Sequence, residues 1–174
     1  MKERSLTEIL SSPVPKEIIL GYFKQNPNLF WEAMELSTTN QRPQNWRSCW
    51  IIFHLMEEND ARLLPKVSDF IKAIPGKPDG HQRELIKILS RMQLNEEQEG
   101  ELFDICMNIW ESPKLIPSIR MMAFRFVMKV LKKFPELITE LDYLTQDQYL
   151  DSLSPGIKNS VNRQFEQIKK SVKA

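Results

Sequence analysis

The stretch Arg47-Ser48-Cys49-Trp50-Ile51-Ile52-Phe53 decides the fold, because its pattern recurs twice further along the chain. Arginines stand at positions 47, 83 and 120, which are 36 and 37 residues apart. Apolar residues follow each arginine after three and six positions: Trp50 and Phe53, Ile86 and Leu89, Ala123 and Phe126. Apolar residues at helical spacing, repeated over this period, predict one helical hairpin copied along the chain.

A second apolar run follows each of these three helices. The runs cover 63–74, 102–110 and 137–144, and each is preceded by turn-forming or capping residues. Asn95 and Gln98, for example, have the spacing of a capping box at the start of the middle run. Strand-like alternation of apolar and polar residues does not persist anywhere in the chain. The sequence therefore predicts an all-α fold.

The helix pairs define the expected domain organisation. We expect residues 1–14 to form a loose N-terminal lead and residues 15–174 to form a single helical repeat domain. The pairs are predicted at about 15–37, 43–74, 81–111 and 117–150, the first being degenerate. Residues 155–172 carry one apolar stripe and one polar face, which is what the end cap of a repeat protein needs.

The charge balance excludes a strong overall attraction to polyanions. The chain has 24 Lys and Arg against 23 Asp and Glu, for a formal net charge of +1. The charges are nevertheless distributed unevenly. Residues 82–112 carry three basic and seven acidic side chains, whereas residues 113–174 carry eleven basic and six acidic ones. Such a split can orient a partner, although it does not identify one.

The cysteines and the N-terminus predict a cytoplasmic protein. Cys49 and Cys106 each lie inside an apolar helical run, so we expect free thiols and neither a disulfide nor a zinc site. The first fifteen residues lack an apolar segment of signal-peptide length, and the longest uncharged apolar stretch, 48–56, is too short to cross a bilayer. We expect no cofactor.

The arginine-led helix pairs resemble the HEAT and armadillo superfamily of α-solenoids. The run RSCWIIF after Trp46, the segment NEEQEGEL from Asn95, and Ser112-Pro113-Lys114 also resemble a group of small HEAT-repeat proteins of Bacteroidetes bacteria. The resemblance covers about residues 42–172. It implies a HEAT/armadillo-like α-α superhelix of antiparallel helix pairs with a C-terminal capping helix, in which the second helices line the concave face.

Several residues have both a structural and a functional interpretation. The repeated arginines could contact phosphates or acidic peptides, but their regular recurrence favours bonds to carbonyls or carboxylates of the neighbouring unit. Trp46 and Trp50 could stack on a base, as in HEAT-like DNA glycosylases, yet we expect them in the core. His54 and Glu58 could ligate a metal ion, but the chain offers no third ligand at suitable spacing. We predict no catalytic, cofactor-binding or metal-binding residues.

The polar positions of the second helices are the candidate partner-binding surface. They are more acidic than basic, which disfavours nucleic acid on this face and favours another protein or a peptide, with basic character as one expectation. The expected function is thus a non-catalytic interaction module or scaffold; the alternative is a HEAT-like DNA-binding or glycosylase-type protein. Membrane binding is not expected, and the oligomeric state is left open. The candidate residues are Lys66, Asp69, Glu101, Asp104, Asn108, Glu140 and Tyr143.

Overall fold

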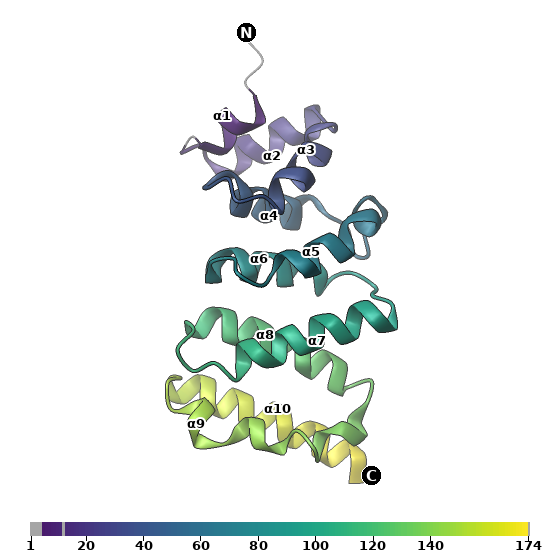
Figure 1. The fold of residues 1–174 in the computed structure, drawn as a ribbon, viewed down its shortest axis with the longest axis vertical. Helices are drawn as coiled ribbons and strands as arrows, with labels where there is room; N and C mark the ends of the chain where they lie inside the picture. The colour runs from purple at the N-terminus through teal and green to yellow at the C-terminus, as the bar shows by residue number, and fades with distance from the viewer. Residues whose placement is uncertain (1–4, 12, 174) are drawn as a thin grey trace. The chain divides into compact units, whose positions relative to one another are not determined.

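The computed structural model describes residues 5–11 and 13–173, and over these residues it contains helices and turns but no strand (Figure 1). The all-α prediction is therefore confirmed. By its contacts the chain divides into two compact units, residues 1–98 and 99–174, which are described separately. The helices are α1 (Leu6–Ser11), α2 (Lys16–Gln25), α3 (Leu29–Ser37), α4 (Gln44–Leu55), η1 (Ala61–Lys66), α5 (Val67–Ala73), α6 (Asp79–Leu89), α7 (Glu96–Trp110), α8 (Pro117–Leu131), η2 (Pro135–Ile138), η3 (Asp142–Thr145), α9 (Asp147–Leu150) and α10 (Pro155–Lys173).

Helix α4 is the centre of the first unit. It packs against α1, α2, α3 and α6. Three apolar residues of the quoted stretch, Cys49, Ile51 and Ile52, lie within about one helical turn and have no solvent exposure. Their burial removes apolar surface from water on several sides of one helix, which is the main favourable term in folding. The stretch 47–53, whose pattern indicates the repeat in the sequence, thus also contributes buried residues to the core of this unit.

The segment 1–14, expected as a loose lead, contains helix α1. Leu6, Ile9 and Leu10 are buried at helical spacing, and α1 packs against α3 and α4. Ser5 and Glu8 form a capping box, in which Ser5 N donates to Glu8 Oε2 (3.0 Å) and Glu8 N donates to Ser5 Oγ (3.3 Å). This short helix is held by tertiary packing, because six residues are too few to be helical alone.

Two of the predicted second helices are broken into shorter pieces. In the range 62–74 the chain first forms the 3₁₀ helix η1, which contains Pro65, and then α5. In the range 136–150 it forms η2, η3 and α9. A physical reason is visible in the second case: Leu144 O accepts a bond from Trp110 Nε1 (3.0 Å) and Tyr149 O accepts one from Arg120 (2.6 Å). The Trp110 side chain therefore binds a carbonyl that a continuous helix would use, whereas Tyr149 O would lack a donor at the end of such a helix. The other predicted second helix is intact as α7, and its capping box joins Asn95 and Gln98 as expected.

The second unit has an aromatic core and two layers. Trp110, Phe124 and Phe165 are buried, with ring centroids 4.7 Å apart for the first pair and 6.2 Å for the second. Helices α8 and α10 contact each other, and both contact η2. Figure 1 shows α7 and the segment with α9 nearer the viewer than α8 and α10. Val161 and Ile168 complete the buried stripe of α10.

Cationic side chains bind the carbonyl oxygens at the ends of several helices. The last carbonyls of a helix have no donor within the helix, and a Lys or Arg both satisfies them and complements the helix dipole. In unit 1 the ends of three helices are bound by cations from further along the chain. The bonds are Arg47 Nη1 to Leu10 O (2.5 Å), Lys77 Nζ to Thr38 O (2.8 Å) and Thr39 O (2.9 Å), and Arg91 Nη1 to Phe53 O (3.2 Å).

Arg120 is the most buried of these cations, with 0% of its surface exposed. Its Nε and Nη2 donate to Trp110 O at the end of α7 (3.1 and 2.9 Å), and Nη2 also donates to Tyr149 O (2.6 Å). Nη1 donates to Ser152 Oγ (2.8 Å), and the guanidinium lies 4.8 Å from the Trp110 ring centroid. No carboxylate of the described residues pairs with it. Burial lowers the pKa of Arg120, so carbonyl dipoles and an aromatic ring carry the stabilisation of this charge.

We predict that Arg120→Leu lowers the free energy of unfolding by about 3 kcal/mol, because the buried carbonyls of Trp110 and Tyr149 lose their donors. Arg125→Leu is the matched control, since Arg125 lies on the same helix but is exposed. The control should change stability by no more than about 0.5 kcal/mol. Urea unfolding monitored by circular dichroism measures both, and equal losses would refute a structural role for Arg120.

Candidate functional site

Lys66 and Asp69 are the predicted partner-binding residues in unit 1. Lys66 Nζ lies 2.8 Å from Glu35 Oε1 and 3.4 Å from Asp69 Oδ2. These bonds, that to Glu35 above all, raise the pKa of Lys66. The structure therefore brings Lys66 and Asp69 together, but it uses the cation of the pair inside the unit. The side chains of Glu35 and Asp69 are more exposed to solvent than that of Lys66, so the exposed surface here is mainly carboxylate.

The other predicted residues lie in unit 2. Glu101, Asp104 and Asn108 follow one another at helical spacing on α7, and the last two are exposed. Glu140 is exposed in the turn between η2 and η3. Tyr143 OH donates to Glu111 Oε1 (2.6 Å), which joins η3 to the end of α7 and raises the pKa of Tyr143 to about 12. Tyr143 therefore has a structural bond as well as a partly exposed ring.

The sign of charge changes with each segment of the C-terminal half. Residues 96–111 carry six acidic and no basic side chains, and residues 112–134 carry six basic and no acidic ones. Residues 135–151 carry five acidic and no basic side chains, and residues 152–174 carry five basic and one acidic. In unit 2 the acidic segments form one layer and the basic segments, which contain α8 and α10, form the other (Figure 1). We call them the acidic layer and the basic layer.

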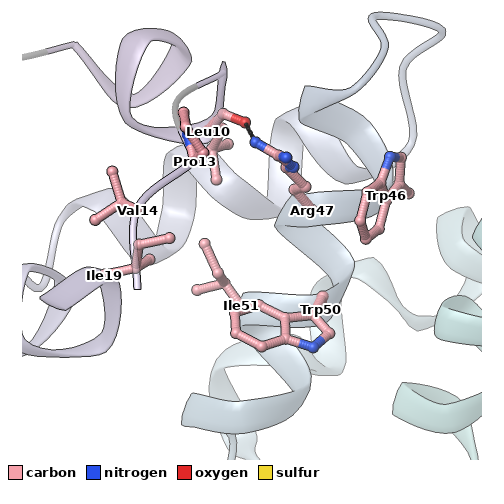
Figure 2. Close-up of a pocket in the computed structure, with 8 residues that line it drawn as sticks. All are labelled: Leu10, Pro13, Val14, Ile19, Trp46, Arg47, Trp50 and Ile51. Atoms are coloured by element: carbon pink, nitrogen blue, oxygen red, sulfur yellow. Dashed lines mark hydrogen bonds between the residues drawn. The ribbon is translucent and has the colours of Figure 1, made fainter. Parts of the chain in front are cut away.

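A small apolar pocket opens in unit 1 (Figure 2). Its volume is about 200 Å³, which is below the range of about 300–1,000 Å³ usual for small-molecule sites. The walls come from α1, the following turn, α2 and α4. The lining residues are Leu10, Pro13, Val14, Ile19, Trp46, Arg47, Trp50 and Ile51. None of these described residues is a carboxylate, a histidine, a cysteine or a serine, so they supply no general base or nucleophile.

The tryptophans on α4 border this pocket. Trp46 and Trp50 are half-buried, which corrects the expectation that both belong to the core. The Trp50 ring lies 4.3 Å from the His54 ring and 5.8 Å from Lys16 Nζ. Figure 2 shows the Arg47 guanidinium directed at the Leu10 carbonyl, which fixes the α1 wall. The expectation that the repeated arginines bond carbonyls or carboxylates of the neighbouring unit therefore holds for Arg47 and Arg120, whereas Arg83 bonds Glu84 of its own helix (3.0 Å).

The residues considered for metal binding and catalysis are engaged elsewhere. The His54 ring bonds Trp50 O through Nδ1 (2.7 Å), and Glu58 pairs with Arg91 (3.1 Å) instead of meeting His54. In the part of the chain that the structure describes, no group of three or more His, Cys, Asp or Glu side chains could hold a metal ion. Cys49 and Cys106 are buried free thiols, and burial raises the pKa of each well above its usual range.

His81 is buried beneath the end of α3. Its Nε2 donates to Ser37 O (2.7 Å), and the Cys49 thiol donates to the same oxygen (3.7 Å). The other ring nitrogen, Nδ1, is buried and has no hydrogen-bond partner among the described residues. Burial lowers the pKa of His81, and the positive charges of Lys77 and Arg42 act in the same direction. The bond to Ser37 O opposes this shift in part, and the net effect is that the folded protein favours the neutral imidazole more than the unfolded chain does.

Comparison with known proteins identifies the family. A family model described as a HEAT repeat domain matches residues 4–168, which is nearly the whole chain. The chain belongs to the HEAT repeat family. No curated protein and no solved structure gives a significant match. The predicted HEAT-like architecture is thereby confirmed, while the closer resemblance to Bacteroidetes proteins stays a prediction. HEAT repeats commonly mediate protein interactions through extended surfaces. Over residues 5–11 and 13–173, every helix is too short or too polar to span a bilayer.

Sequence reasoning missed two features of this HEAT repeat protein. The charge sign alternates between segments from residue 96 onward, and this is visible in the sequence. Counting the charges of residues 113–174 together hides the pattern, because this range contains one acidic segment and two basic ones. Counting charge by predicted helix would have found the two layers. The pocket had a weaker signal, the Ser5-x-x-Glu8 capping box that places a helix opposite Trp50.

We predict that the protein loses stability as the pH falls below about 6.5, the usual pKa of histidine in an unfolded chain. Because the pKa of His81 is lower in the folded state, the unfolded state binds the additional proton. The loss should approach, at most, about 1.4 kcal/mol per pH unit. Urea unfolding at a series of pH values between about 7.5 and about 5, a range that brackets that pKa, measures how the free energy of unfolding changes with pH.

His81→Gln should flatten this dependence, because its amide can donate to Ser37 O but does not titrate. His54→Gln replaces the only other histidine and should keep the dependence. A slope that disappears with His54 and not with His81 would show that His81 is not the group responsible.

Proposed function

We propose that this HEAT repeat protein is a non-catalytic interaction module whose acidic layer in unit 2 binds a basic segment of another protein. The observation that carries the proposal is a layer of carboxylates with no lysine or arginine among them. A surface of one sign steers a partner of the opposite sign and disfavours partners of the same sign.

The acidic layer keeps carboxylates available for a partner. Four of its acids are used within the unit: Glu99 with Lys133, Glu111 with Tyr143, Asp142 with Lys169, and Asp151 with Lys158. Three of these four bonds join the acidic layer to cations of the basic layer. Within the described residues, the remaining acids of the layer make no ion pair or hydrogen bond through their side chains. Those within unit 2 are Glu101, Asp104, Glu136, Glu140 and Asp147, and Glu96 and Glu97 precede that unit at the start of α7.

Apolar side chains lie between these carboxylates. Phe103 and Met107 on α7 are half-buried and flank Asp104 and Asn108 along the helix. Tyr149 is also half-buried, and its ring lies 6.2 Å from that of Tyr143 in an edge-on arrangement. Protein interfaces combine aromatic and methionine contacts with a polar rim, and these contacts supply most of the affinity. The acidic layer therefore offers both the charge and the apolar anchors that a basic amphipathic segment would need.

The observed geometry gives no support to a glycosylase-type enzyme. An excision site needs an aromatic pocket with a carboxylate, and the pocket beside Trp46 and Trp50 has no carboxylate in its walls. The acidic layer would also repel phosphates, which supply most non-specific affinity for DNA. A basic protein segment is the partner that this layer suits.

A fluorescein-labelled amphipathic helical peptide, rich in lysine and leucine, tests the proposal by fluorescence anisotropy. We predict that the wild-type protein binds it and that binding weakens with added salt. Asp104→Lys combined with Glu140→Lys should raise the Kd about tenfold or more, because two attractive contacts become repulsive.

Glu17→Lys combined with Glu32→Lys is the charge-matched control, since both residues are exposed in unit 1. The control should bind the peptide as the wild type does. An acidic peptide of the same length and apolar content should not bind. The proposal fails if both double variants weaken binding equally, or if the acidic peptide binds as tightly as the basic one.

A further inference from the structure

The basic layer carries cations that the protein does not use internally. Arg125 is exposed on α8 and Lys132 directly after its last residue, and Arg163 and Lys170 are exposed on α10. Within the described residues, none of the four makes an ion pair or a side-chain hydrogen bond. We call these four residues the basic row. Cations elsewhere in the layer, such as Lys133 and Lys169, bind carboxylates of the acidic layer.

The two halves of the basic row face the same side of unit 2. Helices α8 and α10 contact each other, and each also contacts η2. Since η2 covers one side of both helices, their exposed residues point away from it. Within each pair the two cations are seven residues apart, and Lys132 keeps helical backbone angles after α8, so each pair spans about 10 Å along the helix axis on nearly the same face. Because packed helices lie about 8–10 Å apart, we infer that the four charges lie near one another.

We propose that the basic row binds the sugar–phosphate backbone of nucleic acid without sequence preference. Exposed cations spaced in this way neutralise phosphates and release counterions, which accounts for most non-specific binding. In this proposal nucleic acid binds the basic layer. The sequence led us to expect that nucleic acid is an unlikely partner, and that expectation was based on the acidic face.

The neighbouring side chains favour this occupant over a protein. Asn159, Asn162 and Gln167 are exposed beside the row on α10 and provide amide donors, which are common phosphate and sugar ligands. The exposed large apolar residues of unit 2 lie singly at or beyond helix ends and form no continuous apolar centre within the row: Ile116, Phe134 and Val172. An interface with a protein would need an apolar centre, and a membrane surface would need an apolar face.

One carboxylate lies in the same region. Glu166 is the only acidic residue of α10, and α8 has none. Its Oε1 is 3.6 Å from Lys169 Nζ, a cation that also pairs with Asp142. Counting Glu166 against the four cations of the basic row therefore leaves the patch positive by three charges. The proposal is independent of the acidic layer, because the two sets of residues do not overlap.

Fluorescence anisotropy with a labelled duplex of about 20 base pairs and a single strand of the same length tests the proposal. We predict binding at low salt that weakens about 100-fold between 50 and 200 mM salt, as about four phosphate contacts require. Arg125→Glu combined with Lys132→Glu should abolish most of this affinity and reduce the salt slope by about two. Circular dichroism checks that this surface variant is folded.

Lys24→Glu combined with Lys72→Glu gives the same change of net charge on exposed residues of unit 1 and should leave binding nearly unchanged. Asp104→Lys combined with Glu140→Lys, on the acidic layer, should not weaken binding either. The proposal is overturned if neither nucleic acid binds at 50 mM salt or if the unit 1 control loses as much affinity. It is also overturned if polyglutamate, or vesicles containing phosphatidylserine, bind the row as tightly as nucleic acid does.

Discussion

Helix ends in this protein are bound by cations that come one repeat later in the chain. Arg47 reaches back 37 residues to Leu10 O, and Arg91 reaches back 38 residues to Phe53 O. Lys77 reaches back 39 and 38 residues to Thr38 O and Thr39 O. Each bond satisfies carbonyls that a helix cannot satisfy by itself and fixes the next helical unit against the preceding one. The period of 36 to 37 residues seen in the sequence therefore has a polar cause as well as an apolar one.

The same use of cations shapes the charged surfaces of unit 2. Arg120 is consumed entirely inside the unit, where it binds Trp110 O and Tyr149 O. Lys133 and Lys169 bind acids of the acidic layer, along the line where the two layers meet. The charges that remain therefore lie on the outer sides of the layers, acidic on one and basic on the other. Two proposed binding surfaces of opposite sign follow from one internal arrangement of ion pairs.

The sequence predicted the architecture because apolar spacing and turn residues act locally. The helices around Trp50 and Ile86, the intact α7 and the amphipathic α10 all follow from helical periodicity and capping residues. The broken second helix at 136–150 did not follow, because Trp110 takes the carbonyl of Leu144 from a distant part of the chain. The acidic character of the candidate surface in unit 2 could be predicted, because it follows from the residue types at the polar positions of the second helices. The internal use of Lys66 and Tyr143 depends on contacts with Glu35 and Glu111 that no spacing rule could supply.

Native-state hydrogen exchange of a Lys77→Met variant tests most directly whether cations of one repeat hold the helix ends of the repeat before it. The account predicts that amides of residues 34–40, at the end of α3, exchange about tenfold faster than in the wild type, because Thr38 O and Thr39 O lose their donor. Lys72→Met, an exposed control on α5, should leave these amides unchanged. Unaltered exchange at residues 34–40, with changes confined to the neighbourhood of residue 77, would contradict the account.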